Sequence, residues 1–189
     1  PDWEGKTSLV ATDNLAGGKL AGEFMAEQLE PGDTVAVLEG VAGAPSLQER
    51  VDGYAEGLGD DFEIVASLPT DCDQTKGLDA AQDILTANPD VTAIYGACGP
   101  PIIGALEAIA SSSKTIKVVG FDAGPDEVAA IVAGDQLASV APEPHPKPTC
   151  VDRAIRVSDR LTVMRYKVQA RCRLFMSAAP RPWRATTPA

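Results

Sequence analysis

Apolar residues between positions 8 and 141 follow two alternating patterns. Short runs that are almost continuously apolar are typical of strands buried on both faces of a sheet. These runs predict strands over residues 8–12, 33–39, 62–67, 91–97, 115–121 and 137–141. Longer stretches with apolar residues at helical spacing lie between them. They predict helices over residues 15–30, 45–58, 73–88, 102–111 and 125–133.

Strands that alternate with helices in this way indicate an α/β protein. The pattern predicts a three-layer α/β/α arrangement, in which a parallel, doubly wound sheet is covered by helices on both faces. In such sheets a ligand sits beyond the carboxyl ends of the strands. That rule selects five loops, at residues 12–14, 40–45, 69–73, 97–101 and 121–125.

The chain changes character near residue 145. Four prolines occupy residues 142–148, and alternating prolines favour an extended connector. Residues 1–144 hold 6 Lys and Arg against 25 Asp and Glu, a net charge of −19, whereas residues 145–189 carry +8. We expect a lobe over residues 8–144 and a basic tail over 145–189. Apolar positions in the tail predict a helix over 151–168, followed by a disordered end.

Composition and cysteine placement narrow the class of protein. Hydrophobic residues make up 44% of the chain and charged residues 23%, as in soluble globular proteins. No segment resembles a membrane span or a signal peptide. The four cysteines include no Cys-x-x-Cys pair, and the single histidine, His145, lies in the connector. We therefore expect separate thiols and neither a metal nor a cofactor, with a disulfide left open.

No catalytic set is visible. The Gly-x-Ser-x-Gly and Gly-x-x-x-x-Gly-Lys motifs are absent. Gly40 and Gly43 indicate a tight turn better than a phosphate loop, and Asp71 and Asp73 indicate helix capping better than a carboxylate pair. The sequence therefore predicts that the protein is not an enzyme.

Binding chemistry has better candidates on the predicted loops and, for Arg50, in the helix predicted over residues 45–58. Thr12, Asn14, Arg50, Phe121 and Asp122 bring charged and amide groups together with an aromatic ring. A sugar has many hydroxyls, which suit charged hydrogen-bonding partners, and apolar ring faces, which suit an aromatic. Two alternatives stay open at this point. Arg50 could form a surface ion pair with Glu49 or Glu56, and Asp122 could cap a helix.

The order of several motifs resembles one known family. In chain order these motifs are Ala-Thr-Asp-Asn at 11–14, Leu-Glu-Gly-Val-Ala-Gly at 38–43, Gln-Glu-Arg at 48–50, Asn-Pro-Asp at 88–90 and Val-Val-Gly-Phe-Asp at 118–122. Together they resemble the ribose-binding-protein type of periplasmic sugar receptor, whose fold is the type I periplasmic binding protein. The resemblance implies that residues 8–144 form the second of two lobes, reached through a connector at residues 1–7. It also implies that Arg50, Phe121 and Asp122 contact the sugar.

Three positions depart from the family pattern. Cys72 stands where the family has an aromatic, Cys98 where it has Asn, and Pro142 where it has Gln or Asn. These residues fall at ligand-contact positions, so we expect an isolated lobe to bind sugar weakly. The tail departs as well, and we interpret it as a reading-frame change or truncation, with a functional tail as the alternative.

The resemblance also implies a role and a location. It predicts a non-catalytic solute-binding protein for a monosaccharide such as ribose, working with an ABC transporter permease in the periplasm or another extracytoplasmic space. The alternative is the effector-binding domain of a lactose-repressor-type transcription regulator. We expect no nucleic-acid binding by the basic tail, whose charge can pair with the acidic lobe. An exposed hinge face would favour a homodimer.

Overall fold

The computed structural model describes residues 12–141 in full and the backbone of residues 142, 153–156 and 162–166. The helices of this part are α1 (Asn14–Gln28), α2 (Pro45–Leu58), α3 (Gln74–Ala87), α4 (Gly99–Ser111) and α5 (Pro125–Ala133). The strands are β1 (Thr34–Glu39), β2 (Glu63–Pro69), β3 (Val91–Gly96), β4 (Lys117–Phe121), β5 (Ala138–Pro142), β6 (Arg153–Arg156) and β7 (Thr162–Tyr166).

The strands form a single sheet in the order β2-β1-β3-β4-β5-β7-β6. The strands β1 to β5 are all parallel, which confirms the predicted doubly wound sheet. The predicted strands match β1 to β5 to within two residues at each end. Most of the strand predicted over residues 8–12 lies outside the described residues.

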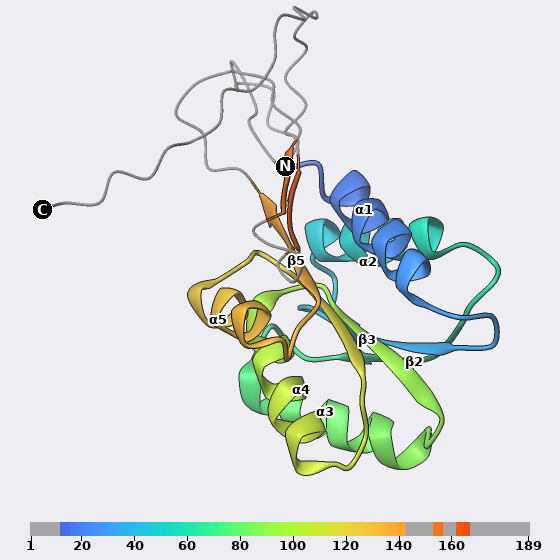
Figure 1. Ribbon diagram of the computed structural model, residues 1–189. Coiled ribbons are helices and arrows are strands. Elements are labelled where there is room, and N and C mark those ends of the chain that lie inside the picture. Colours follow the sequence, from blue (N-terminus) through green and yellow to red (C-terminus); the bar gives the residue numbers. More distant parts are fainter. Residues whose placement is uncertain (1–11, 143–152, 157–161, 167–189) are drawn as a thin grey trace, which may run out of the picture.

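Helices cover both faces of this sheet (Figure 1). In β1, Val35 and Val37 pack with α1 and α2, whereas Ala36 and Leu38 pack with α3 and α4. Successive side chains of a strand point to opposite faces, so a run that is apolar at every position fills both layers. This alternation gives the lobe two separate apolar clusters, one on each side of the sheet.

Glycines let α1 and α2 approach each other closely. A Cβ atom added to Gly53 would lie 1.9 Å from the Leu15 carbonyl oxygen, and one added to Gly18 would lie 2.1 Å from the Arg50 carbonyl oxygen. Both distances are far below van der Waals contact, so a side chain at either site would force the helices apart. The backbone of Arg50 is therefore held directly against α1.

Glycines also let α3 and α4 approach each other closely on the opposite face of the sheet. A Cβ at Gly104 would lie 2.1 Å from the Gln74 carbonyl oxygen, and one at Gly77 would lie 2.4 Å from the Pro101 Cα. Since Gln74 and Pro101 both belong to first turns, this packing brings the amino-terminal ends of the two helices together.

Helix α4 begins earlier than its apolar pattern predicts. It starts at Gly99, whereas the pattern over residues 102–111 suggests a start after two prolines. Proline is well tolerated in the first turn of a helix, where its missing N–H would have no partner within the helix. Pro100 and Pro101 therefore lie inside α4, and Cys98 becomes its N-cap residue.

The helix predicted over residues 151–168 is wrong in the part of that range that the structure describes. Residues 153–156 form β6 and residues 162–166 form β7, which pairs in parallel with β5. Thr, Val and Tyr in β7 favour strands, and β5 would otherwise present an unpaired edge. The pairing of β7 with β5 therefore decided the structure of this segment, although the spacing of its apolar residues suits a helix. The boundary at residue 145 stays a prediction.

The close approach of α1 and α2 leads to a stability prediction. The substitution Gly53→Ala is expected to lower the free energy of unfolding by about 2 kcal/mol, because the clash with Leu15 outweighs the higher helix propensity of alanine. Chemical denaturation measures this change. Glu49→Ala is the control, since it introduces alanine at an exposed position of the same helix. An equal effect of both substitutions would contradict the argument.

Candidate functional site

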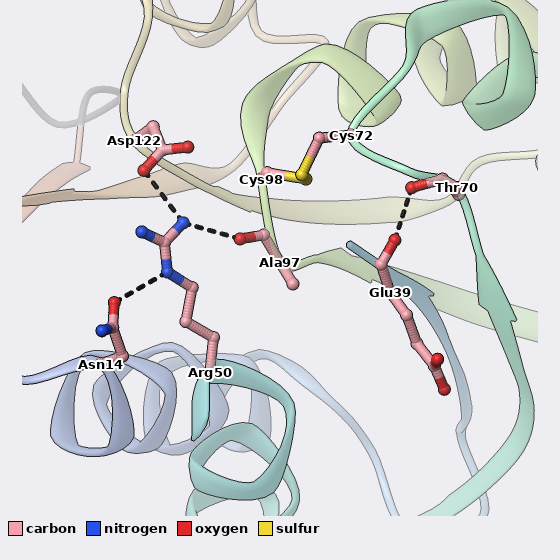
Figure 2. The surroundings of a disulfide bond; sticks show 8 residues. All are labelled: Asn14, Glu39, Arg50, Thr70, Cys72, Ala97, Cys98 and Asp122. Carbon is pink, nitrogen blue, oxygen red and sulfur yellow. Dashed lines mark hydrogen bonds and ion pairs between the residues drawn. A yellow bond between two sulfur atoms is a disulfide. The ribbon is translucent and has the colours of Figure 1, made fainter. Parts of the chain in front are cut away.

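Arg50 lies at the centre of the carboxyl edge of the sheet. Its Nε donates to Asn14 Oδ1 at 3.0 Å, and its Nη1 donates to the Ala97 carbonyl at 2.8 Å and to Asp122 Oδ1 at 3.0 Å. These partners come from α1, from the loop after β3 and from the loop after β4. Figure 2 shows the guanidinium held between the three of them. Segments distant in sequence therefore meet at one side chain.

Two aromatic residues support Arg50. The Arg50 Cζ atom lies 3.9 Å from the centre of the Phe121 ring, which is a cation–π geometry. Phe121 is fully buried, so its ring positions Arg50 and does not face solvent. Burial raises the pKa of the Tyr95 hydroxyl, which stays protonated and donates to the Arg50 carbonyl at 3.4 Å. The arginine is fixed at both its backbone and its head group.

Asp122 is held in an unusual backbone conformation. Its φ is 89° and that of Ala123 is 49°, a region that residues other than glycine rarely adopt. The Asp122 N–H donates to the Val140 carbonyl at 2.7 Å, and the Ala123 N–H donates to Ser139 Oγ at 3.0 Å. Strand β5 thus holds the turn that points the Asp122 carboxylate at Arg50.

This arrangement leaves one donor group and one acceptor open. Within the part of the chain that the structure describes, Arg50 Nη2 and Asp122 Oδ2 make no hydrogen bond. The Arg50 side chain is 12% exposed and that of Asp122 is 41% exposed. Donors beside an acceptor at a partly exposed edge can hold two neighbouring hydroxyl groups of a neutral ligand.

The alternative roles of Arg50, as a surface ion pair, and of Asp122, as a helix cap, are wrong. Glu56 pairs with Lys19, and Arg50 turns inward to Asp122. The N-cap of α5 is Gly124, not Asp122. The expected helix capping is confirmed for α3, where Asp73 accepts from the Lys76 N–H at 2.9 Å.

Two more carboxylates near this edge of the sheet, those of Asp13 and Asp71, have structural roles. Asp13 accepts from the Ala16 N–H at 3.2 Å and caps α1. Asp71 pairs with Lys76, so Asp71 and Asp73 have separate roles and do not act as a carboxylate pair.

Cys72 and Cys98 form a disulfide, with their Cα atoms 5.8 Å apart (Figure 2). The expectation of separate thiols is therefore wrong for these two cysteines. Neither lies in a recognisable pair motif, and 26 residues separate them. Their proximity comes from the packed first turns of α3 and α4. Thr70, bonded to the Glu39 carbonyl, ties the Cys72 loop to the end of β1.

The disulfide changes the chemistry of two expected ligand contacts. Cys98 is 3% exposed and Cys72 is half-buried. Bonded to each other, the two sulfurs have no thiol hydrogen to donate. The side chain of Pro142, the third altered position, lies outside the described residues, so its contact role stays a prediction.

A hollow of about 270 Å³ opens beside Asp122, between the first turns of α4 and α5. Pro100, Ile103 and Pro125 contribute apolar walls. Glu127 also lines the hollow but is almost fully buried, and this burial raises its pKa. Its carboxyl accepts from Gln136 Nε2 at 3.0 Å and from the Gly124 N–H at 3.2 Å.

The structure brings Arg50, Phe121 and Asp122 together, but their predicted contact with a sugar stays a prediction, and the Phe121 ring lies buried under Arg50. The sequence analysis missed two contributors to this cluster. The Ala97 carbonyl is a backbone group, so no residue type could have indicated it. The disulfide required knowledge of how α3 packs on α4. Asn14 was a candidate by its loop position, and the structure places it on Arg50.

Other kinds of site are not found among the described residues. No group of three or more His, Cys, Asp or Glu in this part of the chain is arranged to hold a metal ion. No helix described by the structure has the length and apolar character needed to cross a membrane.

Comparison with known families identifies the chain. The family model described as periplasmic binding protein domain matches residues 3–147. The chain belongs to this family. The ribose import binding protein RbsB of Haemophilus influenzae is 38% identical over 139 residues, which cover 73% of this chain and 48% of that protein. The D-allose-binding periplasmic protein of Escherichia coli is 37% identical over 142 residues, covering 72% and 46% respectively.

Solved structures of the periplasmic binding protein family agree with this assignment. The structure of a periplasmic ribose ABC transporter from Conexibacter woesei superposes with a TM-score of 0.69 at 33% identity, covering 72% of this chain and 47% of that one. The chain thus spans about half the length of the curated relatives it matches. This likeness and the family match confirm the expected fold and the resemblance drawn from the motif order.

The disulfide leads to a second stability prediction. The double substitution C72S/C98S is expected to lower the free energy of unfolding by about 3 kcal/mol, because the 26-residue separation restricts the unfolded chain. Denaturant titration measures the change. C150S/C172S removes the same number of cysteines but keeps the disulfide, so it is the matched control. A loss no larger than that of the control would contradict the prediction.

Proposed function

We propose that residues 8–144 are one lobe of a receptor that binds a monosaccharide, such as ribose or a related pentose or hexose, for uptake by an ABC-type importer. The observation that carries this proposal is the ion pair of Arg50 and Asp122, in which Arg50 Nη2 and Asp122 Oδ2 make no hydrogen bond within the described part of the chain. The names of the relatives refer to ribose and D-allose, which fits a ligand held by hydroxyl groups.

The role we propose is non-catalytic. The relatives are named as binding proteins, and the edge offers positioned hydrogen-bonding groups without a nucleophile beside a base in the described part of the chain. An importer permease would be the partner of the whole receptor. Absence of nucleic-acid binding and formation of a homodimer stay predictions.

The disulfide favours an extracytoplasmic receptor over the alternative of a transcription regulator. Disulfides persist in oxidising compartments and are rare in the cytosol, where such regulators act. The Cys72–Cys98 bond therefore supports a periplasmic or other extracytoplasmic location. Mapping of peptides from protein alkylated at cell lysis tests this choice. Free Cys72 and Cys98 thiols in cells would favour the regulator.

We expect the chain to bind its sugar weakly. A complete receptor with micromolar affinity has a binding free energy of roughly −8 kcal/mol, and one lobe with half the contacts would retain about −4 kcal/mol, a millimolar dissociation constant. Saturation-transfer NMR titration with ribose, allose and galactose measures this. A Kd tighter than about 10 µM would show that one lobe is sufficient for strong binding.

Two variants test the role of the anchor. Arg50→Ala is expected to raise Kd at least about tenfold, because a hydrogen bond to a charged group contributes about 1.5–3 kcal/mol. Lys19→Ala is the control, since Lys19 pairs with Glu56 and not with Asp122. Absence of saturation transfer from every sugar, or an unchanged Kd in Arg50→Ala, would refute the proposed function.

A further inference from the structure

A carboxyl group is buried beside the turn that carries Asp122. Glu127, in the first turn of α5, is only 1% exposed. Burying a carboxyl group costs free energy unless hydrogen bonds compensate for the lost water. A Cβ atom added to Gly120 would lie 2.0 Å from Glu127 Oε1, and one added to Gly99 would lie 2.7 Å from Glu127 Oε2. Strand β4 and the start of α4 thus both leave space for this carboxyl group.

The turn after β4 donates hydrogen bonds into one connected network. The Ala123 N–H donates to Ser139 Oγ at 3.0 Å, and the Gly124 N–H donates to Glu127 Oε2 at 3.2 Å. Burial raises the pKa of the Glu127 carboxyl, and a hydrogen bond from the Ser139 side chain acts against that rise. Ser139 therefore accepts from the turn and donates to Glu127, so both acceptors of the turn depend on the same carboxyl group.

The second carboxyl oxygen of Glu127 is fixed from the side of β5. Gln136 Nε2 donates to Glu127 Oε1 at 3.0 Å and to the Ala138 carbonyl at 2.9 Å. Gln136 is 2% exposed, so bulk water does not compete for these bonds. Because Oε1 is held at the start of β5, Oε2 stays directed at the turn.

The turn needs such support because its backbone conformation is unfavourable. The φ angles of Asp122 and Ala123 are 89° and 49°, and residues other than glycine keep such angles only where the surrounding structure holds them. A relaxed turn would point the Asp122 side chain elsewhere. That side chain accepts from Arg50 Nη1 at 3.0 Å, so the ion pair depends on the acceptors that hold the turn.

We propose that Glu127 is a positioning residue for ligand binding, whose buried carboxyl group fixes the turn from Asp122 to Gly124 and thereby aims the Asp122 carboxylate at Arg50. This inference rests on the proposed function, in which Arg50 and Asp122 bind the sugar. Glu127 acts through Asp122, because both of its carboxyl oxygens already accept hydrogen bonds from the protein.

The ion pair can be observed without any sugar. In Glu127→Ala the Gly124 N–H loses its acceptor, so we expect the guanidinium hydrogens of Arg50 to exchange with water about fivefold faster, equivalent to about 1 kcal/mol. NMR of the isotope-labelled full chain measures this rate. A residue that only caps α5 would lower the stability of the protein without a specific change at Arg50.

Ile131→Ala is the matched control for this experiment. It truncates another buried residue of α5, 1% exposed, and leaves every acceptor of the turn in place. We expect exchange at Arg50 to stay within about twofold of the rate in the unaltered chain. Unchanged exchange in folded Glu127→Ala, or equal acceleration in both variants, would overturn the inference.

Sugar binding tests the consequence for the ligand. Saturation-transfer NMR titration with ribose, allose and galactose is expected to show a Kd about fivefold higher in Glu127→Ala and within about twofold in Ile131→Ala. Faster exchange at Arg50 with an unchanged Kd would overturn the inference. If the unaltered chain binds none of these sugars, the proposed function fails, and the exchange rates still decide whether Glu127 positions Asp122.

A second variant keeps the inference testable if Glu127→Ala does not fold, which thermal unfolding checks. Ser139→Ala removes the acceptor of the Ala123 N–H with a smaller loss of volume. We expect it to accelerate exchange at Arg50 in the same direction. Unchanged exchange in folded Ser139→Ala would show that this network does not position Asp122, and the inference would be overturned.

Discussion

Backbone contact between paired helices is the constraint on which the rest of this lobe depends. Gly18 and Gly53 bring α1 against α2 on one face of the sheet, and Gly77 and Gly104 bring α3 against α4 on the other. At each position a single methyl group would meet a backbone atom. Such contacts tolerate no sliding, because the helices cannot exchange one side-chain packing for another. The helix ends at the carboxyl edge of the sheet are therefore held in a fixed position.

Each half of the carboxyl edge of the sheet follows from one of these pairs. The pair α1 and α2 sets Arg50 beside Asn14, so the guanidinium can also reach Ala97 and Asp122 across the sheet. The pair α3 and α4 brings Cys72 and Cys98 within bonding distance. The polar anchor and the covalent link are thus consequences of the same packing rule on opposite faces.

The disulfide between Cys72 and Cys98 adds a covalent link at the cost of two thiol groups. Two positions that the family resemblance assigns to ligand contacts instead form a covalent bond between the loops after β2 and β3. Such a bond stabilises mainly by restricting the unfolded chain. It also leaves no thiol hydrogen at these two positions.

The sequence by itself determined the layers of residues 12–141, because continuous apolar runs suit strands buried on both faces and the helical spacing between them suits helices that cover the sheet. It also indicated Arg50, Phe121 and Asp122, because their residue types and motif order suit sugar binding. Tertiary structure decided the rest. The Cys72–Cys98 pairing and the Ala97 acceptor depend on how distant segments pack. The buried position of Phe121 depends on Arg50 lying over it, and the strand β7 exists because β5 offers an edge, a long-range pairing that helical spacing within residues 151–168 does not contain.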